Sequence, residues 1–382
     1  MFDQIIAFIR KQYQQKEGRI FLHEPRFIGN EKEYLMECID STFVSSVGKF
    51  VDQFEEKMAE YTGCKKAIAV SNGTSALHIG LLLAGVERGD LVITQPLSFI
   101  ATCNAISYTG ADPIFVDVDE NTLSLSAIEL AKFLENEVTI KEGKAIHRTT
   151  QRAIRACVPM HTFGHPGEID LIVELCEKYH IPVVEDAAEG MGSFYKEKHL
   201  GTFGKIGTLS FNGNKIITTG GGGMILTDDE ELGKKAKHLT TQAKIPHRWE
   251  FRHDHIGYNY RLPNINSALG CAQLEVLPTY LERKRKLAKA YENFFTDHPI
   301  QFVKEPANST ANYWLNAVML KDRAERDEFL AHMNDHGIMV RPVWDLLNDL
   351  NLFDGIEFGD LATAKNIADR LVNLPSSVTL NE

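Results

Sequence analysis

The sequence predicts an α/β protein in which a large domain with a mostly parallel sheet precedes a smaller C-terminal α+β domain. Short apolar runs alternate with helical patterns between about residues 67 and 242, which is typical of parallel strands covered by helices on both faces. Beyond Pro263 the pattern changes to long helical stretches with short strands between them. A length of 382 residues is enough to bury the cores of two domains.

Three parts of the chain follow from these patterns. We expect an N-terminal helix and arm over residues 1–30, the large domain over residues 31–250 and the small domain over residues 251–382. Apolar and charged residues alternate over Met1–Tyr13, in a helix too short and too polar for a signal or membrane segment. The two domains are expected to join near residues 245–262.

The elements of the large domain can be placed in order. A short helix is expected over Glu31–Cys38, and a second one that starts near Phe50 stops at Gly63, a residue suited to a helix C-terminus. The strands expected next are Ala67–Val70, Asp90–Thr94, Pro113–Asp117, Ala156–Met160, Ile181–Val184, Gly207–Phe211 and Met224–Thr227. The helices between them are expected to run from the turn after Val70 through Ala84, and over Phe99–Tyr108, Glu168–Tyr179 and Asp229–Gln242. The polar stretch Glu135–Thr150 is expected to be a surface excursion.

The small domain is expected to be mostly helical. Its expected helices are Ile265–Leu277, Tyr280–Phe295, Arg323–His336 and Ala362–Leu371, with short strands near Ala317–Leu320 and Ile338–Arg341. No internal repeat or low-complexity segment interrupts either domain.

Composition narrows the class of function. A formal charge of −11 and the lack of any long Lys/Arg run argue against a nucleic-acid surface. The six cysteines are scattered, with no CxxC pair, so we expect free buried thiols in a reducing cytosol. No apolar run reaches the length of a membrane span, and we therefore expect a soluble, cytoplasmic protein.

The stretch Thr208–Met224 carries the first candidate catalytic residue. A strand-like run ends at Phe211, Lys215 follows in a polar loop, and the four glycines Gly220–Gly223 precede a second strand. Consecutive glycines indicate positive φ angles or a very close approach to the backbone. A lysine can be a covalent catalyst when a shielded pocket keeps its amine neutral. Taken alone, the stretch fits a hairpin with a solvated lysine equally well.

A second candidate lies at the first strand-to-helix turn. Gly73-Thr74-Ser75 offers backbone N–H groups and hydroxyls at a helix N-terminus, which suits a phosphate. Simple capping of the helix by Ser or Thr explains the same residues, and for this turn alone it is the favoured interpretation. The turn is neither a GxxxxGK(S/T) loop nor a GxGxxG dinucleotide fingerprint.

The third candidate is Asp186, which follows the buried run Ile181–Val184. A carboxylate in that position needs a cationic partner, which can be a metal, an arginine or a protonated ring nitrogen. An anion cradle, a buried aspartate and an immobilised lysine together are what pyridoxal phosphate (PLP) chemistry requires. Lys215 would form the Schiff base and move the proton, and Phe99 is placed to stack on the cofactor ring.

Five separate motifs occur in an order that resembles a known family. They are Ser71-Asn72-Gly73-Thr74-Ser75-Ala76-Leu77, Pro96-Leu97-Ser98-Phe99-Ile100-Ala101-Thr102, Glu185-Asp186-Ala187-Ala188-Glu189, Ser210-Phe211-Asn212-Gly213-Asn214-Lys215 and Gly257-Tyr258-Asn259-Tyr260-Arg261-Leu262-Pro263. They resemble the DegT/DnrJ/EryC1/StrS family of PLP-dependent sugar-nucleotide aminotransferases. The resemblance runs from about residue 27 to the C-terminus, and it implies the aspartate-aminotransferase fold, also called fold type I.

The resemblance also implies a role for individual residues. Lys215 matches the Schiff-base lysine, Asp186 the partner of the pyridine nitrogen, Glu189 the residue beside the ring hydroxyl and Phe99 the stacking ring. Asn259 matches an asparagine that reaches the phosphate from the neighbouring subunit, which implies a homodimer. The residues that match phosphate contacts are Gly73, Thr74, Ser75 and Ser210. Relatives with His at the lysine position dehydrate sugars, so Lys215 favours transamination.

Further stretches are similar to a narrower group, the aminotransferases of the legionaminic-acid pathway. They are Leu22–Asn30, Asp40–Gly48 and Arg341–Trp344. This similarity implies transfer from L-glutamate to C4 of a UDP-linked 4-keto-6-deoxy N-acetylated sugar, for bacterial surface glycans. The alternatives are a GDP-linked 4-keto or TDP-linked 3-keto sugar and, from another class, a non-enzymatic regulator that keeps the fold. Arg341 suits a diphosphate, the donor's carboxylate or a structural ion pair.

One histidine-rich segment was weighed as a metal site. His247, His253 and His255 lie close to Glu250 and Asp254 in the sequence. Their spacing matches no standard zinc pattern, and the lysine chemistry needs no metal. We therefore expect no metal, and a substrate-facing loop between the domains instead.

Overall fold

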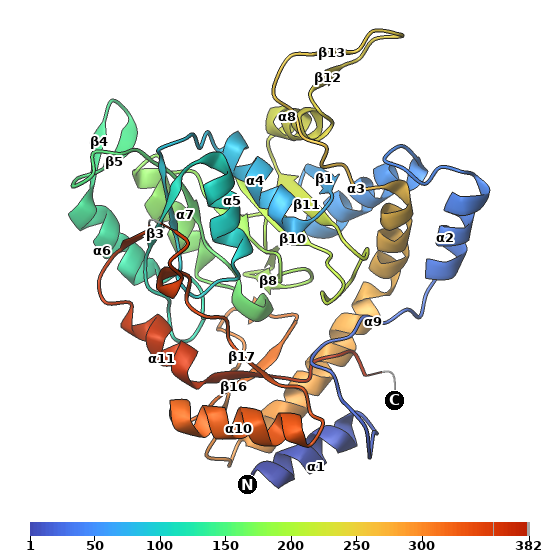
Figure 1. Ribbon diagram of the computed structural model, residues 1–382, viewed down its shortest axis with the longest axis vertical. Helices are drawn as coiled ribbons and strands as arrows, with labels where there is room; N and C mark the ends of the chain where they lie inside the picture. The colour runs from blue at the N-terminus through green and yellow to red at the C-terminus, as the bar shows by residue number, and fades with distance from the viewer. Residues whose placement is uncertain (354, 380–382) are drawn as a thin grey trace.

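The computed structural model describes residues 1–353 and 355–379. A large domain lies above a smaller one, and the helix α9 (Asn264–Phe295) runs along both (Figure 1). Within the described residues, no helix combines the length and apolar character that crossing a bilayer requires.

The large domain is built on two four-stranded sheets that are joined side by side. The first has the order β1 (Lys66–Val70), β11 (Gly223–Thr227), β10 (Ile206–Ser210) and β7 (Val184–Asp186), and the second the order β18 (Ile356–Glu357), β3 (Asp112–Phe115), β2 (Leu91–Thr94) and β6 (Ile154–Val158). Parallel bridges from Cys157 to Val183 and from Met160 to Asp186 join β6 to the β7 segment. Only β11 runs antiparallel to its neighbours in these sheets, within the described residues. The carboxyl ends of β1, β2, β7 and β10 therefore meet at one edge, where α/β proteins bind ligands.

Helices cover both faces of this sheet, as the apolar strands require. The helices α4 (Gly73–Leu83), α5 (Ala101–Thr109) and α8 (Glu230–Thr240) pack on one face. The helices α3 (Lys49–Thr62), α7 (Ile169–Lys178) and the first half of α9 lie over the other, with α6 (Ala127–Glu137) beside α7. Ile68 and Val70 of β1 point into the first core, and Ala67 and Ala69 into the second, which follows the two-residue period of a strand.

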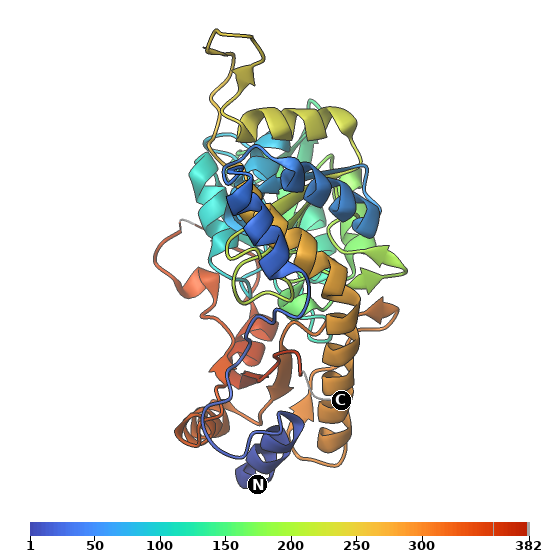
Figure 2. The same cartoon turned by 90° about the vertical axis from the view of Figure 1, so that its right-hand side faces the viewer.

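The small domain has an antiparallel sheet with helices against it. Its order is β14 (Gln301–Phe302), β16 (Asn316–Met319), β19 (Leu371–Leu374) and β17 (Arg341–Pro342). The helices α10 (Arg323–Asp335) and α11 (Ala362–Arg370) complete it. The N-terminal helix α1 (Phe2–Gln12) lies beside α10 in both views (Figures 1 and 2). Ile5 and Ile9 of α1 are fully buried in the same apolar cluster as Phe329 of α10.

Smaller elements connect these layers. They are α2 (Glu31–Asp40), β4 (Val138–Lys141), β5 (Lys144–His147), β8 (Phe194–Tyr195), β9 (Lys198–His199), β12 (Lys244–Ile245), β13 (Arg252–His253), β15 (Ser309–Thr310) and the 3-10 turns Thr162–Gly164 and Leu347–Asp349. The hairpin of β12 and β13 projects beyond α8, away from both domains (Figures 1 and 2).

Most of the expected helices and strands are confirmed, and two expectations are wrong. The helices expected on either side of residue 278 form one helix, α9, which contains Pro278. Proline removes one helical hydrogen bond, but Leu277 and Tyr280 are fully buried beside it and their packing holds the two halves in line. The stretch Glu135–Thr150 is a surface excursion as expected, and most of it forms the hairpin of β4 and β5. The last expected strand begins only at Arg341.

Candidate active site

Lys215 lies in a tight loop after β10, and its side chain is largely shielded. Its backbone N–H donates to Asn212, and its side chain is 14% exposed. The amine Nζ lies 3.2 Å from Oε1 of Glu189 and 3.8 Å from the centre of the Trp314 ring. Although β10 and β11 do pair as an antiparallel hairpin, the lysine between them is not solvated. The amine is thus shielded from bulk solvent, with a carboxyl and an aromatic face beside it.

The glycines after Lys215 serve two different purposes. Gly220 has a φ of +81°, a conformation that side chains rarely adopt. At Gly223, where β11 begins, an added Cβ would lie 2.5 Å from the carbonyl carbon of Asn72. The strand can therefore pass directly beneath the start of α4 only because this residue lacks a side chain. This brings the Lys215 loop and the Gly73 turn together.

Asp186 ends β7 and is buried below the same edge. Its Oδ2 accepts a hydrogen bond of 2.7 Å from the Thr102 hydroxyl, and its Oδ1 accepts one of 3.2 Å from the N–H of Ala188. Burial raises the pKa of Asp186, while the two hydrogen bonds and the charge of Lys215 oppose that shift. A cation placed against the remaining lone pairs would remove the cost of burying this carboxylate.

Glu189 is the second buried carboxyl group of the site. Its Oε2 accepts a hydrogen bond of 2.8 Å from the N–H of Phe163, and its Oε1 faces Lys215. Burial raises the pKa of Glu189 to about 7, against the opposing charge of Lys215. Phe163 holds a φ of +57°, which is strained for an aromatic residue, and this conformation aims its N–H at Glu189. Glu189 can therefore change its protonation state near neutral pH.

The turn before α4 has the form of an anion cradle. Asn72 caps the helix by accepting a 2.8 Å hydrogen bond from the N–H of Ser75, so the cap is neither the serine nor the threonine of the motif. The other N–H groups of the first turn, at Gly73 and Thr74, have no intrahelical acceptor. An added Cβ at Gly73 would lie 3.0 Å from Cβ of Ser210. The backbone at Gly73 and the Ser210 side chain thus border the same small space.

The two remaining predicted site residues, Phe99 and Asn259, are both exposed. Phe99 is 50% exposed, and its ring meets that of Trp344 edge-on with 6.1 Å between centroids. Its free face is available for stacking. Asn259 is exposed, and within the described residues its side chain makes no contact with the cradle. Only the backbone of the next residue reaches that region, because the carbonyl of Tyr260 accepts a hydrogen bond from the N–H of Ser71.

Three residues of the site were not assigned a role from the sequence. Thr102 is the last residue of the motif that contains Phe99. Its hydroxyl, which donates to Asp186, could have been recognised as a candidate site group from that position. Phe163 and Trp314 had no such signal, because nothing in the local pattern marks a strained N–H or a distant aromatic face. The Trp314 indole N–H donates to the carbonyl of Asn214 at 2.7 Å, across 100 positions of sequence.

The residues of this edge fit PLP. A phosphate would fit the cradle in which Gly73 leaves no room for a side chain, and the buried Asp186 could offer its carboxylate to a protonated ring nitrogen. The amine of Lys215 is shielded, and the carboxyl of Glu189 lies beside it. Each of these features would suit one chemical group of the cofactor.

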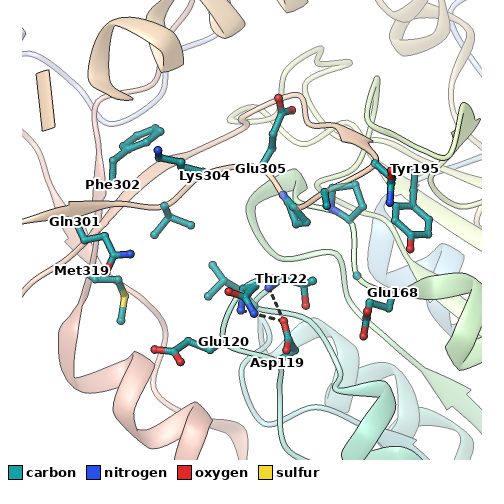
Figure 3. A pocket seen from close by; sticks show the side chains of 18 of the residues that line it. Asp119, Glu120, Thr122, Glu168, Tyr195, Gln301, Phe302, Lys304, Glu305 and Met319 are labelled. Atoms are coloured by element: carbon teal, nitrogen blue, oxygen red, sulfur yellow. Dashed lines mark hydrogen bonds between the residues drawn. The ribbon is translucent and has the colours of Figure 1, made fainter. Parts of the chain in front are cut away.

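A cavity of about 730 Å³ lies elsewhere, between the two domains (Figure 3). It is lined by the loop 119–123, residues 166–168 and the small-domain segment 301–308. Carboxylates from Asp119, Glu120 and Glu168 border it, and none of the predicted cofactor residues does. Its size does not make it the active site, because the reactive lysine and its partners line a different space.

The histidine-rich segment forms the base of the projecting hairpin. His238 of α8 and His255 both contact Oδ1 of Asp254, at 2.6 and 2.9 Å. These hydrogen bonds, from His255 and His238, lower the pKa of the exposed Asp254 to about 2. The nitrogen of His253 bonds instead to the carbonyl of Gln242. The ion pairs fasten the hairpin to α8.

Comparison with known proteins gives one consistent result. The sequence model of the DegT/DnrJ/EryC1/StrS aminotransferase family matches residues 26–382. The chain is 39% identical over 360 residues to the GDP-perosamine synthase of Escherichia coli O157:H7, which covers 94% of each chain. The aminotransferase TlmJ of Streptoalloteichus hindustanus superposes with a TM-score of 0.86 at 28% identity, over 96% of this chain and 95% of the other. Helicobacter pylori PseC, an aminotransferase involved in pseudoaminic acid biosynthesis, gives 0.85 at 25% identity, over 95% of both chains.

Proposed function

Because the chain belongs to the DegT/DnrJ/EryC1/StrS aminotransferase family, we propose that it transfers an amino group from L-glutamate to C4 of a nucleotide-linked 4-keto-6-deoxy sugar. The fold is the aspartate-aminotransferase type, the cofactor is PLP, and the activity is that of a sugar aminotransferase. We propose further that the sugar is N-acetylated and UDP-linked, and that its product serves surface glycan synthesis.

One observation carries the proposed reaction. The Lys215 amine lies 3.2 Å from a buried carboxyl of Glu189, on the same edge of the sheet as Asp186 and the Gly73 cradle. A regulator that only kept the fold would have no use for a shielded lysine beside a carboxyl whose pKa burial raises to about 7. The arrangement supports an enzyme over the non-catalytic alternative.

Each side chain has a defined task. PLP, when bound, supplies an aldehyde that condenses with amines and a ring that takes up electrons as a proton leaves the neighbouring carbon. The first turn of α4, with Ser75 and Ser210, would hold the phosphate, and Asp186 would keep the ring nitrogen charged. The amine of Lys215 would hold the aldehyde and then, once free, carry the proton.

Two neighbours tune that proton transfer. Glu189 lies 3.2 Å from the Lys215 amine, and burial raises the pKa of this carboxyl to about 7, so it can gain or lose a proton near neutral pH. The Trp314 ring covers the same amine at 3.8 Å and excludes water from that side. The hydroxyl of Thr102 donates to Asp186 at 2.7 Å and fixes the carboxylate, whose other lone pairs would be available to a ring nitrogen.

For the nucleotide of the sugar substrate, a specific observation also supports a second candidate. The similarity of Leu22–Asn30, Asp40–Gly48 and Arg341–Trp344 to legionaminic-pathway enzymes supports UDP and an N-acetylated sugar. The E. coli relative is named as a GDP-perosamine synthase, and its 39% identity favours GDP as the second candidate. A TDP-linked 3-keto sugar remains the third.

We also propose a cytoplasmic homodimer whose partner contributes Asn259. Large apolar side chains stand exposed on the projecting hairpin and beside it, namely Trp249 at 70%, Phe251 at 81% and Ile256 at 84%. Such side chains are normally covered in a monomer, so a second copy is the expected cover. Asn259 lies exposed three residues beyond Ile256, where a partner's cradle can meet it. The six buried free thiols favour a reducing compartment.

A panel of sugar nucleotides tests the proposal. The purified protein with PLP is given glutamate and then UDP-, GDP- or TDP-linked keto sugars, and the products are read by mass spectrometry and NMR. We expect glutamate alone to change the absorbance of the bound cofactor, and the UDP-linked 4-keto sugar to give a 4-amino product. Turnover of the GDP-linked sugar alone would replace the nucleotide assignment, and no response to glutamate would refute the enzyme.

A further inference from the structure

We infer that Lys284 and His23 are positioning residues for Lys215, because they hold the groups that enclose its amine. Lys284 lies in the middle of α9 and His23 in the N-terminal arm, so neither belongs to a motif of the active site. This inference deepens the proposed function and rests on it for its kinetic test, but its structural test does not.

Lys284 is a fully buried lysine with an unusual set of partners. Its exposed fraction is 0%, and its Nζ donates to the carbonyls of Ser376 at 2.5 Å and Trp314 at 3.1 Å. Its third contact is Nε2 of His23 at 3.1 Å. Across the described residues no carboxylate forms an ion pair with it, and burial lowers its pKa well below the usual value. Lysine is rarely buried without a counter-charge, so this one needs a reason.

The contacts lead from Lys284 to the catalytic lysine through a single residue. The Trp314 carbonyl is bound by Lys284, and the indole N–H of the same residue donates to the carbonyl of Asn214 at 2.7 Å. Asn214 directly precedes Lys215, and the Trp314 ring lies 3.8 Å from the Lys215 amine. Trp314 is therefore fixed by Lys284 on one side and fixes the reactive loop on the other.

His23 is the third partner of the Lys284 amine, and it comes from the N-terminal arm. Burial is the main cause that holds the pKa of its imidazole well below the usual value. The charge of Lys215 acts in the same direction, and the backbone of Asn214 opposes it. The arm that carries it is tied to the C-terminal segment by the bond from Ser376 N to Leu22 O, at 2.7 Å.

A positioning role differs from a purely structural one in what it changes. A residue that only stabilises the fold would affect the stability of the whole protein, and its loss would leave the geometry of the reaction unaltered once the chain is folded. A positioning residue changes kcat more than KM, because the misplaced group acts in the transition state. It also loosens the loop selectively, which can be measured without cofactor.

The first test is amide hydrogen exchange of the cofactor-free protein. Lys284→Met removes the amine at nearly constant length, and Lys286→Met changes an exposed lysine on the same helix as the matched control. We expect exchange in the segment 212–220 and at Trp314 to quicken at least about tenfold in Lys284→Met and to stay at the parental rate in Lys286→Met. Parental exchange there in Lys284→Met, or a uniform increase through the whole chain, would overturn the inference.

The second test uses His23, which avoids any folding defect of the lysine variant. His23→Gln keeps a polar partner for the Lys284 amine, whereas His23→Leu keeps none. We expect His23→Leu to lower kcat about 10²-fold with KM changed less than about threefold, and His23→Gln to recover most of the loss. Equal losses in both variants, or none in either, would overturn the inference. A wild-type protein without aminotransferase activity would instead fail the proposed function and leave the exchange test to decide.

Discussion

The amine of Lys215 and the carboxyl of Glu189 lie 3.2 Å apart, although they follow two different strands of the sheet. The Phe163 N–H holds the other oxygen of Glu189 at 2.8 Å, and the Trp314 ring covers the amine. In the proposed transamination, this pair would place an amine that can bond to carbon beside a carboxyl that can change its protonation state near neutral pH. The predictions below each disturb one contact of this site.

Glu189→Gln should remove one source of pH dependence from the stability of the cofactor-free protein. Burial raises the folded pKa from 4.5 to about 7, so the stabilising protonated form is fully present below pH 4.5 and is lost as the pH rises through 7. The wild-type protein should therefore lose about 3 kcal/mol between these limits relative to the variant. Calorimetric melting curves from pH 4.5 to 8 measure the difference, with the exposed Glu174→Gln as control. Parallel curves for wild type and Glu189→Gln would contradict the assignment.

Asp186→Asn should slow the reaction far more than it weakens cofactor binding. The amide cannot balance a positive ring nitrogen, while the cradle still holds the phosphate. We expect kcat to fall at least about 10²-fold and the affinity for PLP to change less than about tenfold. Steady-state kinetics and fluorescence titration with PLP measure the two quantities, and the exposed Asp52→Asn is the control. An unchanged kcat would show that Asp186 does not face the ring.

Thr102→Val should act through Asp186. Its hydroxyl donates to that carboxylate at 2.7 Å and lowers the carboxylate's pKa, so its loss should raise that pKa further. The pH above which kcat reaches its plateau should therefore move upward, and stability should fall by about 1–2 kcal/mol. Thr102→Ser keeps the hydroxyl and should keep the parental pH profile. A profile that is identical in the valine variant would separate Thr102 from the chemistry.

Mixing two inactive variants tests the shared site. Lys215→Ala lacks the reactive amine, and Asn259→Ala lacks the group proposed to cross to the partner's phosphate. If the subunits exchange, a mixed dimer carries one site with both residues intact, so activity should return to about a quarter of the wild-type level. Activity that stays at the sum of the separate variants after verified exchange would place Asn259 in its own subunit's site or outside it.

How much of the fold and of the site could be predicted from the sequence depends on how far apart the contacting residues lie along the chain. The strands before Asp186 and Lys215 follow from short apolar runs, and their carboxyl ends meet because parallel topology requires it. The pattern failed where tertiary packing overrides a local rule, as at Pro278, which lies inside one continuous helix. It also failed for Trp314, whose bond to Asn214 spans 100 positions and leaves no mark on the local pattern.

The resemblance to a family helped most where the residues alone were ambiguous. The Gly73 turn fits both a capped helix and a phosphate cradle, and the structure shows that Asn72 does the capping while Gly73 and Thr74 remain at the open first turn. The hairpin interpretation of the lysine stretch was also half right, since β10 and β11 do pair. Only the three-dimensional arrangement shows that Lys215 points inward rather than into solvent.

The account depends most directly on the bond between Lys215 and the cofactor. The holoprotein is reduced with borohydride, digested, and the peptides are examined by mass spectrometry, with Lys215→Ala treated in parallel. We predict one phosphopyridoxyl adduct, on the peptide that contains Lys215, and for Lys215→Ala no turnover but cofactor that is still bound without a covalent link. An adduct on a different lysine, or full activity in Lys215→Ala, would contradict the account.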